Sequence, residues 1–374
     1  MSTTALVVGG TGPTGPHIVR GLQERGYEVA ILHRGTHETD ELGDLEHLHA
    51  DPHFQESVEQ VLGVRSFDVV VSTYGRLRRV AAAVGGRCDE FVGVSGVPVY
   101  AGYHEPEARW PRGMPIATAE GDASQERPFG EEESAAARFA RAIHDTERSV
   151  LALHDQGAFR ASLFRYPSIY GPRQLYPRDW SIIRRVLDGR TRVILPDGGL
   201  TILTRCAAVN AANFLLTAVD RPDAAGGQVF NVGDLQQYSL RQWTQMVARY
   251  AGGELDVVSL PFDLAGPGRE LFPVPHADHG LVSIHRACTR LGYVEAVPAA
   301  EALRASVEWY LEHPPEPRVV EGMVDTFDYA AEDRLMDRFA QVTAELRAEQ
   351  GEARTADHPY AHPTAPGATD HRGR

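Results

Sequence analysis

Residues 4–26 read TALVVGGTGPTGPHIVRGLQERG, and this stretch decides the fold. Its apolar first part is typical of a buried parallel strand, and the apolar spacing over 14–26 predicts a helix. Between the two, Gly9, Gly12 and Gly15 are spaced three residues apart. Glycines there permit a tight turn, close approach of a pyrophosphate to the backbone, and packing of the helix on the sheet. The stretch therefore predicts a dinucleotide-binding turn at the N-terminus of a helix.

The same alternation of strand and helix continues along the chain. Further apolar runs predict strands over 27–35, 45–51, 67–75, 90–100 and 159–172, with a helix over 131–155. Strands that alternate with helices predict an α/β fold with a doubly wound parallel sheet. We expect residues 1–172 to form the dinucleotide-binding domain.

Beyond Pro172 the pattern changes. Helical spacing covers 179–190, 206–222, 239–252 and 324–350, with short strands at 192–199 and 228–234 and with Ser239 as a helix N-cap. We expect 202–234 to return to the first domain, and 173–201 with 235–347 to form a smaller substrate domain. Residues 348–374 carry Pro, Gly and His without periodicity, which predicts a disordered tail.

Composition excludes several classes of function. A formal net charge of −14 argues against nucleic acid or an anionic membrane as a partner. No apolar run reaches the roughly 18 residues of a membrane span, and the first residues lack the basic start of a signal peptide, so we expect a cytoplasmic protein. Three widely separated cysteines predict neither a disulfide framework nor a metal site. All 37 basic residues are arginine, which rules out chemistry on a lysine amine.

The residues after the second strand bear on the type of cofactor. An acid there holds the ribose 2′-hydroxyl of NAD, but this chain has His33 and Arg34 instead. A guanidinium suits a 2′-phosphate through paired hydrogen bonds, so we favour NADP(H) over NAD(H). The alternative is that Arg34 is a solvated loop residue. Asp51, the last residue of the third strand, either receives the adenine amino group or caps the turn that follows.

Five stretches together resemble the short-chain dehydrogenase/reductase superfamily, in its extended or atypical branch of the NAD-dependent epimerase/dehydratase type. They are GGTGPTG (9–15), Asp51, VSGVPVYAG (94–102), RYPSIYGPR (165–173) and FNVGD (230–234). The resemblance implies a Rossmann-type domain with a smaller, mostly C-terminal domain for a small-molecule substrate, and a possible homodimer through the 131–155 helix. The resemblance and the glycine turn together predict the following cofactor-binding residues: Gly9, Thr11, Gly12, Pro13, Thr14, Gly15, His33, Arg34, Asp51, Tyr74, Tyr166 and Pro167.

The chain departs from the catalytic pattern of that family, which is a Ser or Thr followed by a Tyr and a Lys four residues apart. Counting back from Val99-Tyr100 places the Ser/Thr position on Gly96, one residue from Ser95. Aligning Glu147 with the family's glutamate places Phe139 and Ile143 at the Tyr and Lys positions. No shift of this alignment supplies the missing tyrosine and lysine, because residues 104–165 contain no tyrosine and the chain contains no lysine.

Other side chains are then candidates for proton transfer. They are Ser95 in the fifth strand, Tyr100 at its end, and Tyr103 and His104 after it. Each phenol is alternatively a packing residue, and the histidine is alternatively a solvated one. A tyrosine alone is a weak acid near neutral pH, whereas an imidazole titrates there. We expect an NADP-dependent enzyme of the reductase or epimerase/dehydratase kind that acts on a small hydroxylated or carbonyl metabolite with a non-standard proton donor. The alternatives are a non-redox lyase, dehydratase or cyclase on this scaffold, and a non-catalytic NADP(H)-sensing protein.

Overall fold

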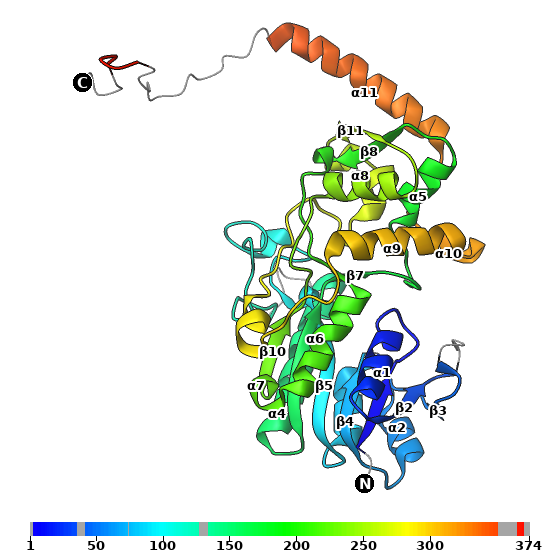
Figure 1. The fold of residues 1–374 in the computed structure, drawn as a ribbon. Coiled ribbons are helices and arrows are strands. Elements are labelled where there is room, and N and C mark those ends of the chain that lie inside the picture. Colours follow the sequence, from blue (N-terminus) through cyan, green and yellow to red (C-terminus); the bar gives the residue numbers. More distant parts are fainter. Residues whose placement is uncertain (1–2, 36–41, 74, 127–133, 351–364, 370–374) are drawn as a thin grey trace. The chain divides into compact units, whose positions relative to one another are not determined.

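The structure is a computed structural model that describes residues 3–35, 42–73, 75–126, 134–350 and 365–369. The chain divides into two compact units, Met1–Phe327 and Asp328–Arg374. The described part of the second unit contains one long helix, α11 (Tyr329–Gln350) (Figure 1). Among the described helices, none combines the length and apolar character that crossing a bilayer requires.

The first unit is built on a sheet of seven parallel strands in the order β10-β6-β5-β4-β1-β2-β3. The strands are β1 (Thr4–Val8), β2 (Glu28–His33), β3 (Glu46–His49), β4 (Phe67–Ser72), β5 (Cys88–Gly96), β6 (Arg160–Tyr166) and β10 (Gln228–Asn231). The chain runs outward from β1 through β2 and β3, then returns to β4 on the other side of β1. The carboxyl ends of β1 and β4 therefore flank a topological switch point, where such sheets bind ligands. The predicted doubly wound sheet is confirmed.

Helices cover both faces of this sheet, which explains the unbroken apolar runs of its strands. They are α1 (Gly15–Glu24) and α6 (Ala208–Asp220) on one face, and α2 (Gln55–Leu62), α3 (Leu77–Val84) and α4 (Ala135–Asp155) on the other (Figure 1). Along β1, Ala5 and Val7 enter the core with α1 and α6, whereas Leu6 and Val8 enter the core with α2 and α3. Successive strand residues point to opposite faces of the sheet, so alternate side chains of β1 enter different cores.

The remaining elements of the first unit surround a separate core that includes Trp180, Trp243 and Leu303. They are α5 (Trp180–Leu187), β8 (Arg192–Pro196), α8 (Leu240–Tyr250), β11 (Asp256–Leu260), α9 (Ala299–Glu312) and α10 (Pro317–Glu321), with β8 paired to β11. A short ladder of β7 (Ser168–Tyr170) with β9 (Arg205–Ala207) and the small helix α7 (Pro222–Ala225) complete the regular elements. Helical turns lie at Val97–Val99, Pro106–Ala108, Asp197–Gly199, Phe262–Leu264, Pro267–Leu271 and Ala287–Leu291. Ser239 caps α8 as predicted, since its side chain accepts a hydrogen bond from the backbone N–H of Gln242.

The structure differs from the sequence prediction in two of the strands. The predicted strand 90–100 ends as β5 at Gly96, and the helical turn Val97–Val99 follows it. The run 159–172, predicted as a single strand, forms β6 in the main sheet and β7 in a separate ladder. Pro167 stands between them, and proline has no N–H to donate to a ladder. The predicted boundaries of the two domains remain a prediction.

Candidate functional site

The glycine loop between β1 and α1 has the geometry of a tight turn. Gly9 adopts a φ of 89°, in the region that favours glycine, and its N–H donates to the carbonyl of Leu32 at 3.0 Å. A Cβ on Gly15 would lie 1.8 Å from the carbonyl oxygen of Gly10, so only glycine fits where the helix meets the loop. At Gly12 the nearest atom to such a Cβ is the carbonyl oxygen of Gly9, at 3.9 Å. Packing thus requires Gly15, whereas Gly12 leaves the outer side of the loop open.

A cavity of about 280 Å³ lies at this loop. Eight of the nominated cofactor residues line it: Gly9, Thr11, Gly12, Pro13, Thr14, His33, Arg34 and Tyr166. Thr73, Ile169 and Leu175, which the sequence reasoning did not nominate, complete the lining. The N-terminus of α1 and the carboxyl ends of β1 and β2 thus meet around one space, and a helix N-terminus favours anions.

The other four nominated residues are placed differently. Gly15 starts α1, and Pro167 follows Tyr166 between β6 and β7. Asp51 accepts hydrogen bonds from the backbone N–H of His53 at 3.0 Å and from its Nδ1 at 2.7 Å. These bonds lower the pKa of Asp51, the backbone bond most, and they cap the turn as one alternative expected. Tyr74 lies outside the described residues.

A second cavity of about 610 Å³ lies at the ends of β5 and α3 and along α4. Tyr166 lines both cavities, so the two spaces are adjacent. Phe139 and Ile143 of α4 line the second cavity, together with Ser95 at the end of β5. The exposed Arg76 and Arg78 at the start of α3 add two positive charges that the sequence reasoning missed.

Three of the candidate side chains for proton transfer are already engaged or deeply buried. Ser95 donates its hydroxyl to Oε1 of Glu147 at 2.5 Å, and Arg165 donates to both oxygens of Glu147, at 2.9 and 2.7 Å. The Tyr100 hydroxyl donates to Oδ1 of Asn231 at 2.7 Å. Burial raises the pKa of Tyr100, and it raises the pKa of Tyr103 to about 12. Both phenols are therefore poor proton donors near neutral pH.

The buried pair of Glu147 and Arg165 was not nominated as part of the site, yet it organises this region. It joins α4 to β6, and the guanidinium of Arg165 lies 4.7 Å from the centre of the Tyr100 ring. Removing one partner of such a buried pair costs roughly 3–5 kcal/mol, because the other charge stays buried without compensation. Glu147 and Arg165 are separated in the sequence, and no local pattern predicts that they contact one another.

His104 has a different environment. Its Nε2 is buried and has no hydrogen-bond partner among the residues that the structure describes. Its ring meets the edge of Tyr103, with centroids 5.0 Å apart, and lies 6.1 Å from the ring of Phe139, which lines the second cavity. Burial, with a further contribution from His276, lowers the pKa of His104 below its ordinary value, so the ring is neutral near pH 7. A neutral imidazole with an unengaged nitrogen can accept or pass on a proton.

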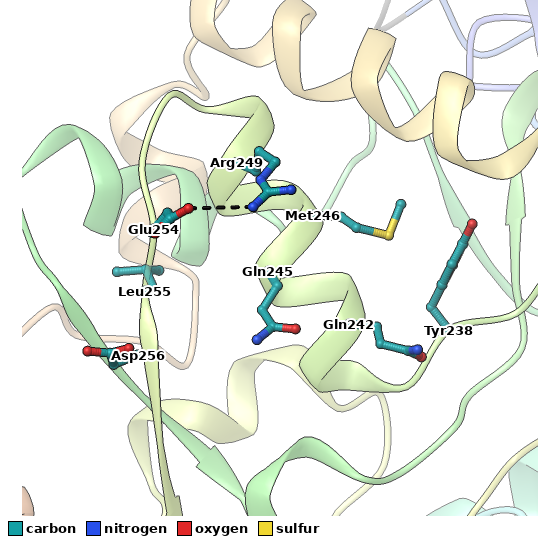
Figure 2. Close-up of a pocket in the computed structure, with 8 residues that line it drawn as sticks. All are labelled: Tyr238, Gln242, Gln245, Met246, Arg249, Glu254, Leu255 and Asp256. Atoms are coloured by element: carbon teal, nitrogen blue, oxygen red, sulfur yellow. Dashed lines mark hydrogen bonds and ion pairs between the residues drawn. The ribbon is translucent and has the colours of Figure 1, made fainter.

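A further cavity of about 530 Å³ lies between α8 and the start of β11 (Figure 2). Side chains of α8 and of the segment entering β11 surround it, among them Gln242, Gln245 and Met246. Figure 2 shows Arg249 facing Glu254, and the two form an exposed ion pair at 3.5 Å. The lining holds no histidine, cysteine or buried carboxylate, so this cavity offers little for catalysis.

Comparison with known proteins agrees with this arrangement. The model of the NAD dependent epimerase/dehydratase family matches residues 5–87 and 116–233, more than half of the chain. No curated protein sequence matches the chain.

Several solved structures share the fold. The UDP-glucose 4-epimerase of Thermotoga maritima, with UDP-glucose, has a TM-score of 0.66 at 16% identity and covers 84% of this chain and 100% of its own. A dTDP-glucose 4,6-dehydratase of Streptomyces venezuelae, with NAD and TYD bound, has a TM-score of 0.62 at 18% identity, covering 83% and 97%. The UDP-glucuronic acid 4-epimerase of Bacillus cereus, in complex with UDP-glucuronic acid and NAD, has a TM-score of 0.62 at 17% identity, covering 83% and 100%. At these identities the likeness concerns the fold, and it is the family match that assigns the chain: this protein belongs to the NAD-dependent epimerase/dehydratase family.

Proposed function

We propose that this chain binds NADP(H) and acts as an epimerase/dehydratase-type oxidoreductase on a small hydroxylated or carbonyl metabolite, with a histidine as the proton-transfer group. The observation that carries the proposal is the cavity at the glycine loop, which eight nominated residues line and which Tyr166 connects to a second, larger cavity. A dinucleotide in the first cavity would direct its nicotinamide toward the second, where a substrate would meet it.

The preference for NADP(H) rests on the residues at the end of β2. His33 and Arg34 line the first cavity, and neither is the acid that would hold a free ribose 2′-hydroxyl. Two of the related structures named above were solved with NAD, so the proposed preference for NADP(H) rests on this chain's own residues. A guanidinium on a 2′-phosphate contributes about 1.5–3 kcal/mol through charge-assisted hydrogen bonds, which corresponds to roughly 10- to 100-fold in affinity.

The substitution Arg34→Ala tests this preference. We expect NADPH to bind roughly 10- to 100-fold more weakly, while NADH affinity changes little. Arg249→Ala removes an arginine from the exposed pair on α8 and serves as the matched control, with both affinities retained. Equal losses for the two cofactors in Arg34→Ala would refute the assignment.

His104 is the group that we propose for proton transfer. Its ring lies 6.1 Å from the ring of Phe139, which lines the second cavity, and its buried Nε2 has no partner in the described part of the chain. The hydroxyls of Tyr100 and Ser95 are instead engaged with Asn231 and Glu147. We expect His104→Gln to abolish turnover with NADPH affinity intact. The exposed His285 offers the control His285→Gln, which should leave turnover unchanged.

The proposed substrate is a metabolite that carries negative charge. Two exposed arginines, Arg76 and Arg78, line the second cavity together with the apolar Phe139 and Ile143. Sugar nucleotides, the compounds named with the related structures, combine such a charge with hydroxyl and carbonyl chemistry. A panel of UDP- and dTDP-sugars and simple keto acids, scored for product, is therefore the first screen.

One observation favours the non-redox alternative. Phe139 and Ile143, which the family register aligns with its tyrosine and lysine, line the second cavity and offer no proton. A single-turnover experiment separates the two functions, because transient reduction of enzyme-bound NADP⁺ accompanies hydride transfer during epimerisation or dehydration. Product without that transient would establish a non-redox reaction. Tight NADPH binding without product from any substrate would instead support the sensing alternative.

A further inference from the structure

Three histidines from β2 and β3 gather beside the cofactor cavity. His33 ends β2, and the parallel register sets it beside His49, while His47 lies two residues earlier in β3 and so on the same face. The ring centroids lie 4.9 Å apart for His33 and His47, 5.0 Å for His33 and His49, and 6.4 Å for His47 and His49. One ring nitrogen of each residue lies within 4.8 Å of the other two.

Hydrogen bonds assign the protons on two of these rings. The backbone N–H of Gly35 donates to Nδ1 of His33 at 3.2 Å, so this nitrogen carries no proton. Nε2 of His33 then carries the proton and donates to Nδ1 of His47 at 2.7 Å. Nε2 of His47 in turn donates to the carbonyl of Leu42 at 2.9 Å. The network is therefore consistent with neutral imidazoles, the form that binds metal ions.

We propose that His33, His47 and His49 form a binding site for a borderline divalent transition metal of the zinc class. Three imidazoles with a fourth position for water are a characteristic zinc ligand set, whereas Mg²⁺ and Ca²⁺ require oxygen ligands. Tetrahedral coordination at 2.0–2.1 Å sets the ligand nitrogens about 3.3 Å apart, and this spacing lies within the range of the cluster. His47 also makes the outer hydrogen bond of a metal-ligating histidine, from its other nitrogen to a backbone carbonyl.

The three side chains differ in exposure in a way that suits such a site. His33 is buried, His47 is half-buried and His49 is exposed, so the cluster has a fixed inner ligand and an open side toward solvent. The ring of His49 also lies against Gly35, where a Cβ would approach it to 3.4 Å. The cluster thus supports the turn that carries Arg34.

Metal binding would change this turn. When Nε2 of His33 coordinates the ion through its lone pair, the proton moves to Nδ1, which can then no longer accept from the N–H of Gly35. His47 coordinates through Nδ1 and keeps its proton on Nε2. The ion adds two positive charges next to His33 and Arg34, which line the cofactor cavity. We therefore expect occupancy of the site to change the affinity for NADPH; this coupling rests on the proposed function, whereas the metal site does not.

Calorimetric titration of the chelator-treated full chain with Zn²⁺ tests the site, with Co²⁺ as the spectroscopic probe of tetrahedral coordination. We expect one equivalent of Zn²⁺ to bind per chain. His47→Gln and His49→Gln should each weaken Zn²⁺ binding at least tenfold, because even the loss of a group that hydrogen-bonds to a metal ligand commonly costs roughly 10- to 100-fold in affinity. The matched control is the triple variant His358→Gln, His362→Gln, His371→Gln, which removes the histidines of the last 24 residues and should retain the site. Thermal unfolding of each variant confirms that it is folded.

Two results would overturn the proposal. Unchanged Zn²⁺ binding in both His47→Gln and His49→Gln would exclude the cluster as the site, as would loss of binding only in the triple tail variant. For the coupling, we expect Zn²⁺ to shift the NADPH dissociation constant roughly fivefold or more, within the usual range of coupling between sites, and to shift that of NADH less. Saturable Zn²⁺ binding with no effect on NADPH affinity would refute the coupling but not the metal site. Because Zn²⁺ binding is measured without NADPH, failure of the metal site can be told apart from failure of the cofactor proposal.

Discussion

A pair of alanine substitutions in the glycine loop separates the structural role of the turn from its binding role. In Gly15→Ala the new Cβ would lie 1.8 Å from the carbonyl oxygen, 2.2 Å from the carbonyl carbon and 2.7 Å from the Cα of Gly10. Real Cβ atoms keep at least 3.0 Å from such neighbours, so α1 must move away from the loop. Its buried face includes Ile18, Val19 and Leu22, which pack in the core shared with β1 and α6.

The magnitude follows from this clash. Forcing one extra methyl group into a packed site costs about 1–3 kcal/mol, and a rigid backbone on both sides gives the upper end of that range. Since 1 kcal/mol lowers the Tm of a large domain by roughly 2 °C, a cost of about 3 kcal/mol should lower the Tm of Gly15→Ala by roughly 6 °C. Gly12→Ala meets only one atom, at 3.9 Å, so it should keep the parental Tm.

Differential scanning fluorimetry with and without NADPH provides the assay. In Gly12→Ala the methyl group would occupy the approach of a pyrophosphate to the backbone, so we expect a parental Tm without ligand and a much smaller stabilisation by NADPH. Gly15→Ala should unfold earlier even without ligand. A parental Tm for Gly15→Ala, or undiminished NADPH stabilisation of Gly12→Ala, would refute this reading of the loop.

Other substitutions test the packing and chemistry around the second cavity. Glu147→Gln leaves the buried guanidinium of Arg165 without its counter-charge, so urea unfolding should show a loss of roughly 3–5 kcal/mol, and a loss below about 1 kcal/mol would contradict the ion pair. Tyr100→Phe removes a buried hydroxyl that donates to Asn231, so we expect urea unfolding to show a loss of stability while turnover is retained. If a folded Tyr100→Phe variant had no measurable kcat, the Tyr100 hydroxyl would instead be the catalytic group. His104 takes up its proton in the unfolded chain near its ordinary pKa of about 6.5 but only at lower pH in the folded chain, so the parental protein should lose stability as pH falls below about 6.5. His104→Gln should lack that part of the pH dependence, and identical profiles for the two proteins would show that the ring titrates normally.

The residues around the cavity at the glycine loop could be predicted from sequence because the signals that bring them together are local. The strand, the glycines and the helix start follow one another without a gap, and His33 and Arg34 come at the end of the next strand. A parallel sheet brings the carboxyl ends of neighbouring strands to one edge, and the structure accordingly lines one cavity with these residues.

The contacts around the second cavity could be predicted only in part, because they join distant segments. Ser95, Glu147 and Arg165 come from β5, α4 and β6, and no spacing in the sequence indicates that they hydrogen-bond to one another. Tyr100 was nominated by its place after a strand, but the stacking of Arg165 on its ring is a tertiary contact.

The histidine cluster also escaped the sequence reasoning, which expected no metal site. His33 and His47 lie fourteen residues apart and become neighbours only through the register of β2 with β3. Spacing rules for metal ligands recognise residues within one loop or helix, and this grouping lies across two strands.

The central claim is that the cavity at the glycine loop holds a dinucleotide whose adenosine carries an extra phosphate. Isothermal titration calorimetry of the parental full chain with NADPH and with NADH tests it most directly. We predict saturable heat with both, and NADPH bound roughly 10- to 100-fold more tightly, the share assigned to Arg34. Equal affinities would contradict the role of the guanidinium, and no heat from either nucleotide would contradict the cofactor site itself.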